Sequence, residues 1–334
     1  MAEVNEDDRL SKLPDDLLLN IVERLDIADA ARTTILSKRW KDIPVILSKV
    51  VIRANSFESK HTTSKLTKDD MVRSNTTMLD ATRSILERRA GSLHTIQLLC
   101  MQFYLGDESI FIGQTVANCI ATQKTVSIIN TALSWHKMLK LSELLGKTAI
   151  SMLHLNFRSE KIWVKPEGRR QLLPVFHKLR ILNLLNIPEE CDLTWTMFLL
   201  QGAPNLKKLL IVVRDHLCLM VTGEQRKKGA FSEKDKGLEL EPSASDFKHH
   251  NLAGLSIYGR FQAEDKLVSY ARRIMQAAVN LEDIKLYKSP VCQRCKHMLQ
   301  EWTLKEKSSL SYKIKEGMPS LVRIHFPSLG EVFF

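Results

Sequence analysis

Long apolar runs are missing from this sequence, and no stretch approaches the ~18 uninterrupted apolar residues that a membrane-spanning helix needs. The first ten residues, MAEVNEDDRL, are acidic and polar, so we expect no secretory signal there. Cysteine is scarce, and its scattered positions do not suit a disulfide scaffold. The six cysteines are residues 100, 119, 191, 218, 292 and 295. These features predict a location in the cytoplasm or nucleus.

Enzyme signatures are also absent. The sequence has no nucleophile elbow, phosphate-binding P-loop, dinucleotide-binding glycine pattern, HExxH motif or kinase signature. We therefore predict a protein that is not an enzyme and that needs no cofactor.

One short motif resembles half of a zinc site, because Cys292 and Cys295 are followed by His297. Zinc needs four ligands, and no second Cys/His pair with suitable spacing follows. A redox role would need a thioredoxin-like setting, which the sequence lacks. We predict neither metal binding nor redox chemistry here, and we expect His249 and His250 to be exposed polar residues.

The net charge of +11 is unevenly placed. Residues 1–50 carry 8 basic and 10 acidic side chains, so the rest of the chain carries +13. That excess is spread out, whereas nucleic-acid binding needs a local patch or a known module. A diffuse basic surface can attract acidic partners but names none of them. Nucleic-acid binding is therefore the weaker interpretation.

One basic cluster stands out, and it could bind phosphate or an acidic peptide. A solvated outer face of the fold is the favoured interpretation. The cluster comprises Arg158, Lys161, Lys165, Arg169 and Arg170.

With 334 residues, 44% of them hydrophobic and 26% charged, the chain is typical of a globular protein of about two domains. Near the N-terminus an apolar residue recurs every fourth position, which predicts a helix with one apolar stripe. The stripe is Leu13, Leu17, Ile21 and Leu25, with Leu18 and Val22 beside it. Pro14 suits the first helical position, and acidic residues follow it in the first turn.

Two more short helices are expected within this segment. Ile27, Ala30, Ala31 and Ile35 form a second apolar run, and Ser37 is a candidate N-cap for a third helix carrying Trp40. About forty residues rarely bury so much apolar surface alone, so the segment is predicted to dock on something else.

The motifs LPDDL at 13–17 and ILSKRW at 35–40, with Ile21 and Leu25 between them, resemble the plant F-box. The resemblance implies binding to a Skp-family adaptor, which joins a cullin and a RING subunit in an SCF ubiquitin ligase. By that resemblance, the residues that meet the adaptor or brace the helices are Leu13, Pro14, Leu17, Ile21, Leu25, Leu36 and Trp40. An ordinary helical subdomain with the same stripe is the alternative.

After this segment, residues 53–77 are polar and are expected to be a connector, and a helix is predicted over 78–90 with Gly91 as its terminator. A Leu-x-x-Leu-x-Leu pattern then recurs. Its copies are 93-96-98, 150-153-155, 179-182-184, 206-209-211, 252-255-257, 281-284-286 and 321-324-326, with a degenerate copy at 123-126-128.

The copies begin 30, 27, 29, 27, 46, 29 and 40 residues apart, mostly at or just beyond the spacing of leucine-rich repeats. The last two aliphatics of each triplet would share one face of a strand and point into the fold. Helix-like stretches at 170–176, 195–200 and 271–278 would cover them. Each unit has an apolar flank that only a neighbour can bury, which predicts stacking into a solenoid. Chance recurrence of leucine triplets is the alternative.

The repeats resemble those of plant F-box proteins with leucine-rich repeats, and residues 247–295 are similar to the FBD region of such proteins. Residues 214–250 are charged and contain several glycines, which predicts a mobile surface insertion.

The predicted fold class is α/β: a three-helix F-box (9–50), a connector with a helix (51–90), and an irregular leucine-rich-repeat solenoid of strand-helix units (91–334). The resemblance implies the substrate-recognition subunit of an SCF ligase, with a protein substrate on the repeats. The alternatives are an interaction scaffold without a cullin and a nucleic-acid-associated repeat protein.

Overall fold

The computed structural model describes most of the chain. The described residues are 12–25, 27–33, 47–58, 67–89, 97–104, 109–119, 125–130, 138–146, 150–157, 162–188, 191–213, 247–261, 266–288, 301–318 and 321–328. No helix among them is long and apolar enough to cross a membrane.

The strands of the described residues form one parallel sheet in chain order, β1 to β9. They are β1 (Lys49–Arg53), β2 (Leu98–Phe103), β3 (Thr125–Asn130), β4 (Met152–Asn156), β5 (Ile181–Ile187), β6 (Lys208–Val213), β7 (Gly254–Gly259), β8 (Asp283–Lys288) and β9 (Arg323–His325). A strand that pairs in parallel with the next one along the chain needs a crossover between them, and helices supply most of these crossovers.

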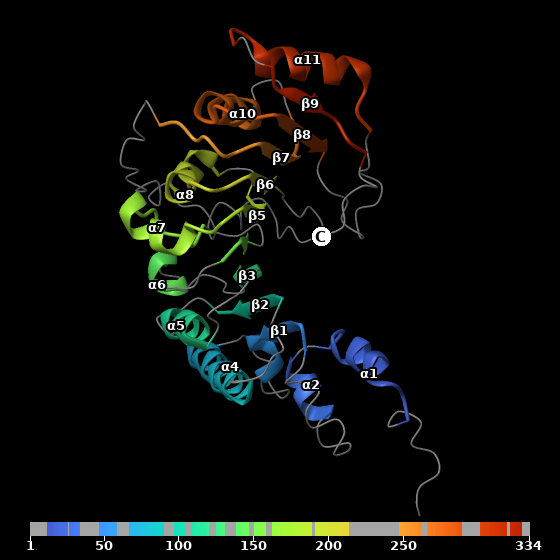
Figure 1. Ribbon diagram of the computed structural model, residues 1–334, viewed down its shortest axis with the longest axis vertical. Helices are drawn as coiled ribbons and strands as arrows, with labels where there is room; N and C mark the ends of the chain where they lie inside the picture. The colour runs from blue at the N-terminus through green and yellow to red at the C-terminus, as the bar shows by residue number, and fades with distance from the viewer. Residues whose placement is uncertain are drawn as a thin grey trace, which may run out of the picture.

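The helices form a row along one side of the curved sheet, while the first two lie at its β1 end (Figure 1). They are α1 (Asp15–Val22), α2 (Ile27–Thr33), the 3-10 turn η2 (Ala54–Phe57), α4 (Lys68–Arg88), α5 (Ser109–Cys119), α6 (Leu141–Leu145), α7 (Arg169–Phe176), η3 (Leu193–Thr196), α8 (Met197–Gly202), α10 (Lys266–Ala277) and α11 (Leu304–Lys315). The mixed strand-helix architecture and the solenoid-like stacking agree with the predicted fold class.

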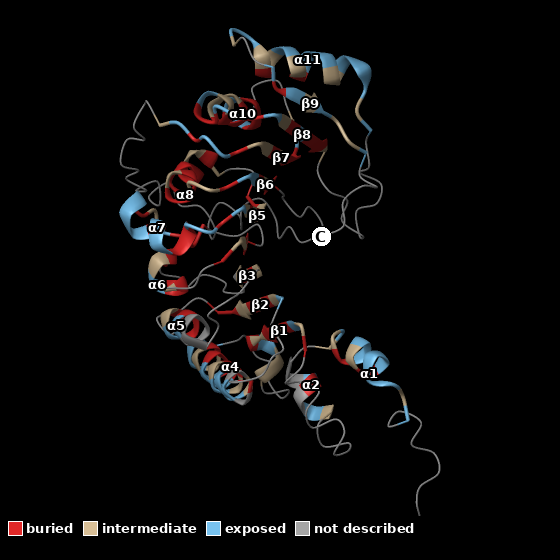
Figure 2. Cartoon of the chain, viewed as in Figure 1, coloured by how far each residue is buried: buried red, intermediate tan, exposed pale blue. Residues whose placement is uncertain are grey.

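The core consists of columns of aliphatic side chains that run across the strands. One column, almost wholly buried, is Val50, Leu99, Val126, Leu153, Leu182, Leu209, Leu255, Ile284 and Ile324. A second column lies two residues further along each strand, so alternate residues face the helices. Figure 2 shows the buried residues gathered where strands and helices meet. Burying each such side chain stabilises the fold by roughly 1.5 to 3 kcal/mol.

The repeat pattern predicted most of the strands. The triplets that begin at Ile150, Leu179, Leu206, Leu252 and Leu281 are buried at all three positions. Val126 and Ile128 of the degenerate copy are buried in β3. The predicted helices at 170–176, 195–200 and 271–278 coincide with α7, with η3 and α8, and with α10.

The first predicted triplet was wrong in register. Leu98 lies on the half-exposed face, whereas Leu99 and Met101 are buried and pair with Val126 and Ile128. The inward pair in β2 is therefore 99 and 101. Residues 96–101 offer aliphatics in both frames, so local spacing alone could not choose between them.

The sheet begins earlier than predicted. Leu47, Val50 and Ile52 match the repeat spacing, are buried, and place β1 in the sheet, within the predicted F-box and connector segments. Helix α4 starts at Lys68, ten residues before the predicted start at 78. Its first turns look polar in sequence, yet Met71 and Asn75 are buried there, so tertiary packing overrides the weak local signal.

The last unit departs from the pattern. Leu321, the first aliphatic of its predicted triplet, is 100% exposed, and the next residue, Val322, is buried. Strand β9 is only three residues long and, among the described strands, pairs only with β8, so this end of the stack constrains the chain less. Ile324 and Phe326 are partly buried against the core as predicted.

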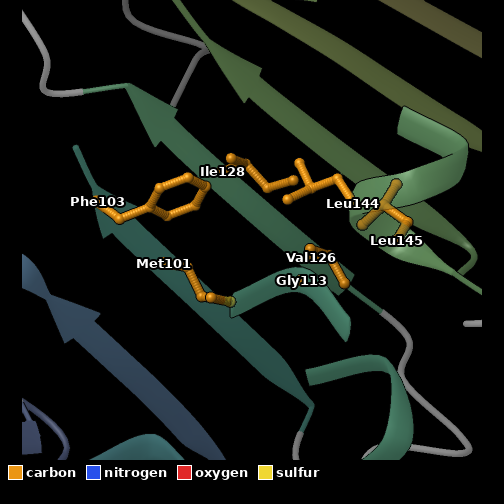
Figure 3. A pocket seen from close by; sticks show the side chains of 7 residues that line it. All are labelled: Met101, Phe103, Gly113, Val126, Ile128, Leu144 and Leu145. Carbon is orange, nitrogen blue, oxygen red and sulfur yellow. The ribbon is translucent and has the colours of Figure 1, made fainter. Parts of the chain in front are cut away.

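Helices α5 and α6 pack so closely that a glycine is required between them. A Cβ on Gly113 would fall on the carbonyl oxygen of Leu144. A small apolar cavity of about 10 Å³ remains beside this contact, lined by Met101, Phe103, Val126 and Ile128 among others (Figure 3). A cavity of this size with an apolar lining stays dry and is too small for a ligand.

Replacing Gly113 by Ala is expected to lower the free energy of unfolding by about 1 to 3 kcal/mol, because backbone atoms of α6 would have to move. Gly254→Ala is the matched control, since a Cβ there meets nothing closer than Lys208 Cγ at 3.8 Å. Urea denaturation of both variants measures the difference. Equal stability of the two would show that α5 and α6 do not pack in this way.

Candidate functional site

Helix α1 carries apolar side chains on two of its faces. Leu18 and Val22 are fully buried in the core of the sheet, whereas Leu17 and Ile21 remain 47% and 40% exposed. Successive helical residues are rotated by about 100°, so these two pairs point in different directions. One helix therefore both joins the solenoid and presents an apolar face outward.

Pro14 extends the outward face, because it is exposed and precedes the first helical residue, Asp15. The first turn carries Asp15 and Asp16, where the helix dipole favours negative charge. Pro14 is thus the N-cap, one position before the predicted one. We define the outward face as Pro14, Leu17 and Ile21.

Polar contacts hold this helix against the first strand. The Glu23 carboxylate, just after α1, accepts hydrogen bonds from the Ser48 backbone nitrogen at 3.3 Å and from its hydroxyl at 2.6 Å. The buried Arg89 guanidinium donates to the carbonyl oxygen of Leu47 at 2.9 Å. Burial lowers the pKa of Arg89. Helix α4 and the segment after α1 therefore converge on the residues that lead into β1.

The other predicted adaptor-binding residues fall into two groups. Leu13 and Leu25 are half-buried and pack against the core, so they brace the helix from the inside. Leu36 and Trp40 lie outside the described residues, as does the predicted third helix.

His249 was expected to be exposed and is instead 3% exposed, so that prediction was wrong. Its Nε2 lies 2.9 Å from the carbonyl oxygen of Ala203, and its Nδ1 accepts a hydrogen bond from the Leu252 backbone at 3.0 Å. Burial lowers the pKa of His249. The side chain links the chain entering β7 to the preceding unit, while His250 is exposed as predicted.

The remaining candidate residues lie partly within and partly outside the described residues. Lys165, Arg169 and Arg170 are exposed around the start of α7, as expected of a solvated face. Residues 158–161, 214–246 and 289–300, including Cys292, Cys295 and His297, lie outside the described residues. Among the described residues, no group of three or more His, Cys, Asp or Glu could hold a metal ion.

The face of the sheet that points away from the helix row carries polar and aromatic groups that were not predicted, and we call it the open face. Near its middle, Asn183 Nδ2 lies 3.2 Å from His154 Nδ1, and Asn186 donates to Asn156 at 2.9 Å. Its C-terminal half carries the buried cluster of Val212, Tyr258 and Tyr287.

The two tyrosine rings of that cluster stack with centroids 4.0 Å apart. The alternate positions of each Leu-x-x-Leu-x-Leu triplet give the open-face residues, so the sequence held the signal once the repeat register was known.

Residues 10–48 match the model of the F-box domain. The match includes α1, α2 and the whole outward face. It supports an F-box protein, and an F-box domain suggests in general a ubiquitin-ligase adaptor role and binding to Skp-family adaptors.

Three relatives from Arabidopsis thaliana agree with this result. One, named for an F-box, an FBD and LRR repeats, is 43% identical over 56 residues, 17% of this chain. A second, named as an FBD-associated F-box protein, is 56% identical over 39 residues, 12% of this chain. A third, named as an F-box protein, is 44% identical over 57 residues, 16% of this chain. This chain covers only 13%, 9% and 12% of their respective lengths.

The buried His249 predicts a pH dependence of folding. The pKa of His249 is lower in the folded protein than in the unfolded chain. Above about pH 6.5 the His249 side chain is mostly neutral in both the folded and the unfolded protein. As the pH falls below this value, His249 takes up a proton in the unfolded chain first. The free energy of unfolding should therefore fall between about pH 6.5 and pH 5, by at most ~1.4 kcal/mol per pH unit for one histidine.

His154, whose pKa burial also lowers, adds to the same trend. Urea denaturation across this range measures the slope, which His249→Asn should flatten. The exposed His250→Asn is the control, and equal flattening in both variants would contradict the assignment.

Proposed function

We propose that this protein is the substrate-recognition subunit of an SCF-type ubiquitin ligase. The outward face of α1 docks a Skp-family adaptor, the adaptor connects to a cullin, and the repeat sheet holds a protein substrate. The F-box match supports this proposal, since F-box proteins are generally non-catalytic adaptors.

The observation that carries the proposal is the division of labour within α1. Leu18 and Val22 are buried in the core of the solenoid. Leu17 and Ile21, which precede them directly in the sequence, remain exposed. An F-box helix without a partner would lose little by carrying polar residues there. Large apolar side chains held on the surface by a rigid helix mark an interaction site.

The reaction gains from proximity alone. A substrate held on the sheet shares one assembly with the ubiquitin-loaded enzyme at the far end of the cullin, which raises the effective concentration of substrate lysines. The orientation of the bound adaptor relative to the solenoid is fixed by the contacts of α1. These are the hydrogen bonds between Glu23 and Ser48 and the buried face of the helix. No residue of this chain needs to take part in the chemistry.

Further assignments extend this proposal. We propose that residues 247–295 form the FBD-like part of the repeat domain, supported by the regular β7-α10-β8 unit within it. The F-box at 9–50 and the repeats behind it would then meet at β1. The complex would act in the cytoplasm or nucleus.

The double variant Leu17→Asp, Ile21→Asp tests the adaptor joint. Burial of each side chain against a partner is worth roughly 1.5 to 3 kcal/mol, so losing both should weaken adaptor binding at least ~100-fold. Pull-down and calorimetry with a purified Skp-family adaptor measure this. Both residues are already exposed, so the thermal unfolding midpoint should hardly change.

Leu304→Asp with Leu321→Asp is the matched control, because these leucines are 82% and 100% exposed at the other end of the stack. If the α1 variant bound the adaptor as tightly as the wild type does, adaptor binding by the outward face of α1 would be refuted. The same would follow if the control variant lost binding equally.

The alternative is an interaction scaffold that binds partners without a cullin. Size-exclusion chromatography of the chain with adaptor and cullin separates the two functions. Co-elution of all three supports the ligase subunit, and a complex that contains the adaptor but never the cullin supports the scaffold.

A further inference from the structure

The last four strands bring several basic side chains together on the open face. Strand register aligns Lys208, Gly254, Asp283 and Arg323 in one row. A second row, two residues further along, contains Ser256, Lys285 and His325. Lys208, Lys285, Arg323 and His325 are all exposed, and we call these four residues the basic patch.

Two lysines flank a gap in the patch. Gly254 has no side chain and Ser256 a small one, and both lie on β7 between Lys208 on β6 and Lys285 on β8. The spacing of strands and residues puts the two lysine Cα atoms about 12 Å apart. Flexible stems of this kind can lean over the gap from both sides, and the Ser256 hydroxyl can donate a hydrogen bond within it. Within the described residues, neither lysine makes an ion pair.

The neighbouring arginine and histidine are held in place by one carboxylate. Asp283 accepts hydrogen bonds from Arg323 Nε at 2.9 Å and Nη2 at 3.1 Å, and His325 Nε2 lies 2.8 Å from the same carboxylate. The contacts of Asp283 with His325 and Arg323 hold its pKa below the usual range. The guanidinium of Arg323 has further N–H groups that can donate to a ligand. Asp283 therefore holds Arg323 in position without using all of its hydrogen-bond donors.

We propose that the basic patch binds an acidic protein segment, with a carboxylate or phosphate group seated over Gly254 and Ser256. Lys208 and Lys285 would pair with the anion from two sides, and Arg323 would bind a second acidic group further along. Three permanent cations around one carboxylate leave a local excess of positive charge. This inference rests on the proposed function, since it names the chemistry of the substrate segment.

A protein segment fits the patch better than nucleic acid does. The patch spans only β6 to β9 and lies beside Asp283, and Glu282 is exposed next to Asp283 in the sequence. The negative charge of these carboxylates would oppose a polyphosphate backbone. An irregular peptide can instead place its acidic groups at Lys208, Lys285 and Arg323 and avoid them. The open-face tyrosines Tyr258 and Tyr287 are buried and add almost no accessible surface.

The experiment uses the full chain and three fluorescent twelve-residue peptides that differ only at alternate positions, which carry Glu, phosphoserine or Gln. We expect the Glu and phosphoserine peptides to bind more tightly than the Gln peptide and to weaken as salt rises. The tighter of the two acidic peptides identifies the preferred anion. The variant Lys208→Glu, Lys285→Glu should weaken acidic-peptide binding by about tenfold or more.

Lys178→Glu with Lys305→Glu is the matched control, because it makes the same change in net charge at exposed positions away from the patch. Equal loss in both variants, or no preference over the Gln peptide, would overturn the proposal. The choice of partner would be overturned if single-stranded DNA bound more tightly than the peptides and if the patch variant lost this DNA binding. No adaptor is present in this assay, so its failure leaves adaptor docking intact. Conversely, a failed adaptor test leaves the peptide result standing.

Discussion

The structure depends on the parallel register of neighbouring strands. In each unit two aliphatic side chains point toward the helices, and the ladder places them in line with those of the units on either side. No unit could bury its own pair, because a single strand and helix enclose too little apolar surface. Neighbouring helices of the row can approach each other closely only where small residues permit it, as at Gly113 against α6 and at Gly202 against α7. Stability therefore belongs to the stack and is shared by nearest neighbours.

The F-box segment is built into this stack. Leu18 and Val22 join the same core as the repeats, and Glu23 bonds to Ser48 at the entrance to β1. Under the proposed function such a rigid joint would matter, because a flexible joint would lower the effective concentration of the bound substrate. The rotation of about 100° per residue lets a two-turn helix serve both the core and a partner.

The open face changes character along its length. Its middle is polar, with Asn186 held at a positive φ of 54° next to the register shift in β5 and bonded to Asn156. Asparagine tolerates this backbone conformation better than most residues do. The strands β6 to β9 carry both the stacked tyrosines and the basic patch, at different positions along the strands. A solenoid suits such a gradient, because each strand contributes its outward residues independently of the core.

Sequence by itself determined the F-box helix, the repeat spacing and most of the buried aliphatics, since these rest on periodicity and short exact motifs. By resemblance it also predicted which residues bind an adaptor. The prediction failed at Leu98, because the sequence there has aliphatic residues in both possible registers. It missed β1, which spans the boundary between the predicted F-box and connector segments. It also failed at His249, because no local pattern indicates that this residue is buried. Only the tertiary structure decided which apolar face of α1 remains exposed, and which residues from separate strands meet in the basic patch. The physical reason is that burial and strand register depend on contacts between neighbouring units, which form only when the units stack. The sequence pattern of one unit shows which apolar side chains it has, but not which residues of other units they contact.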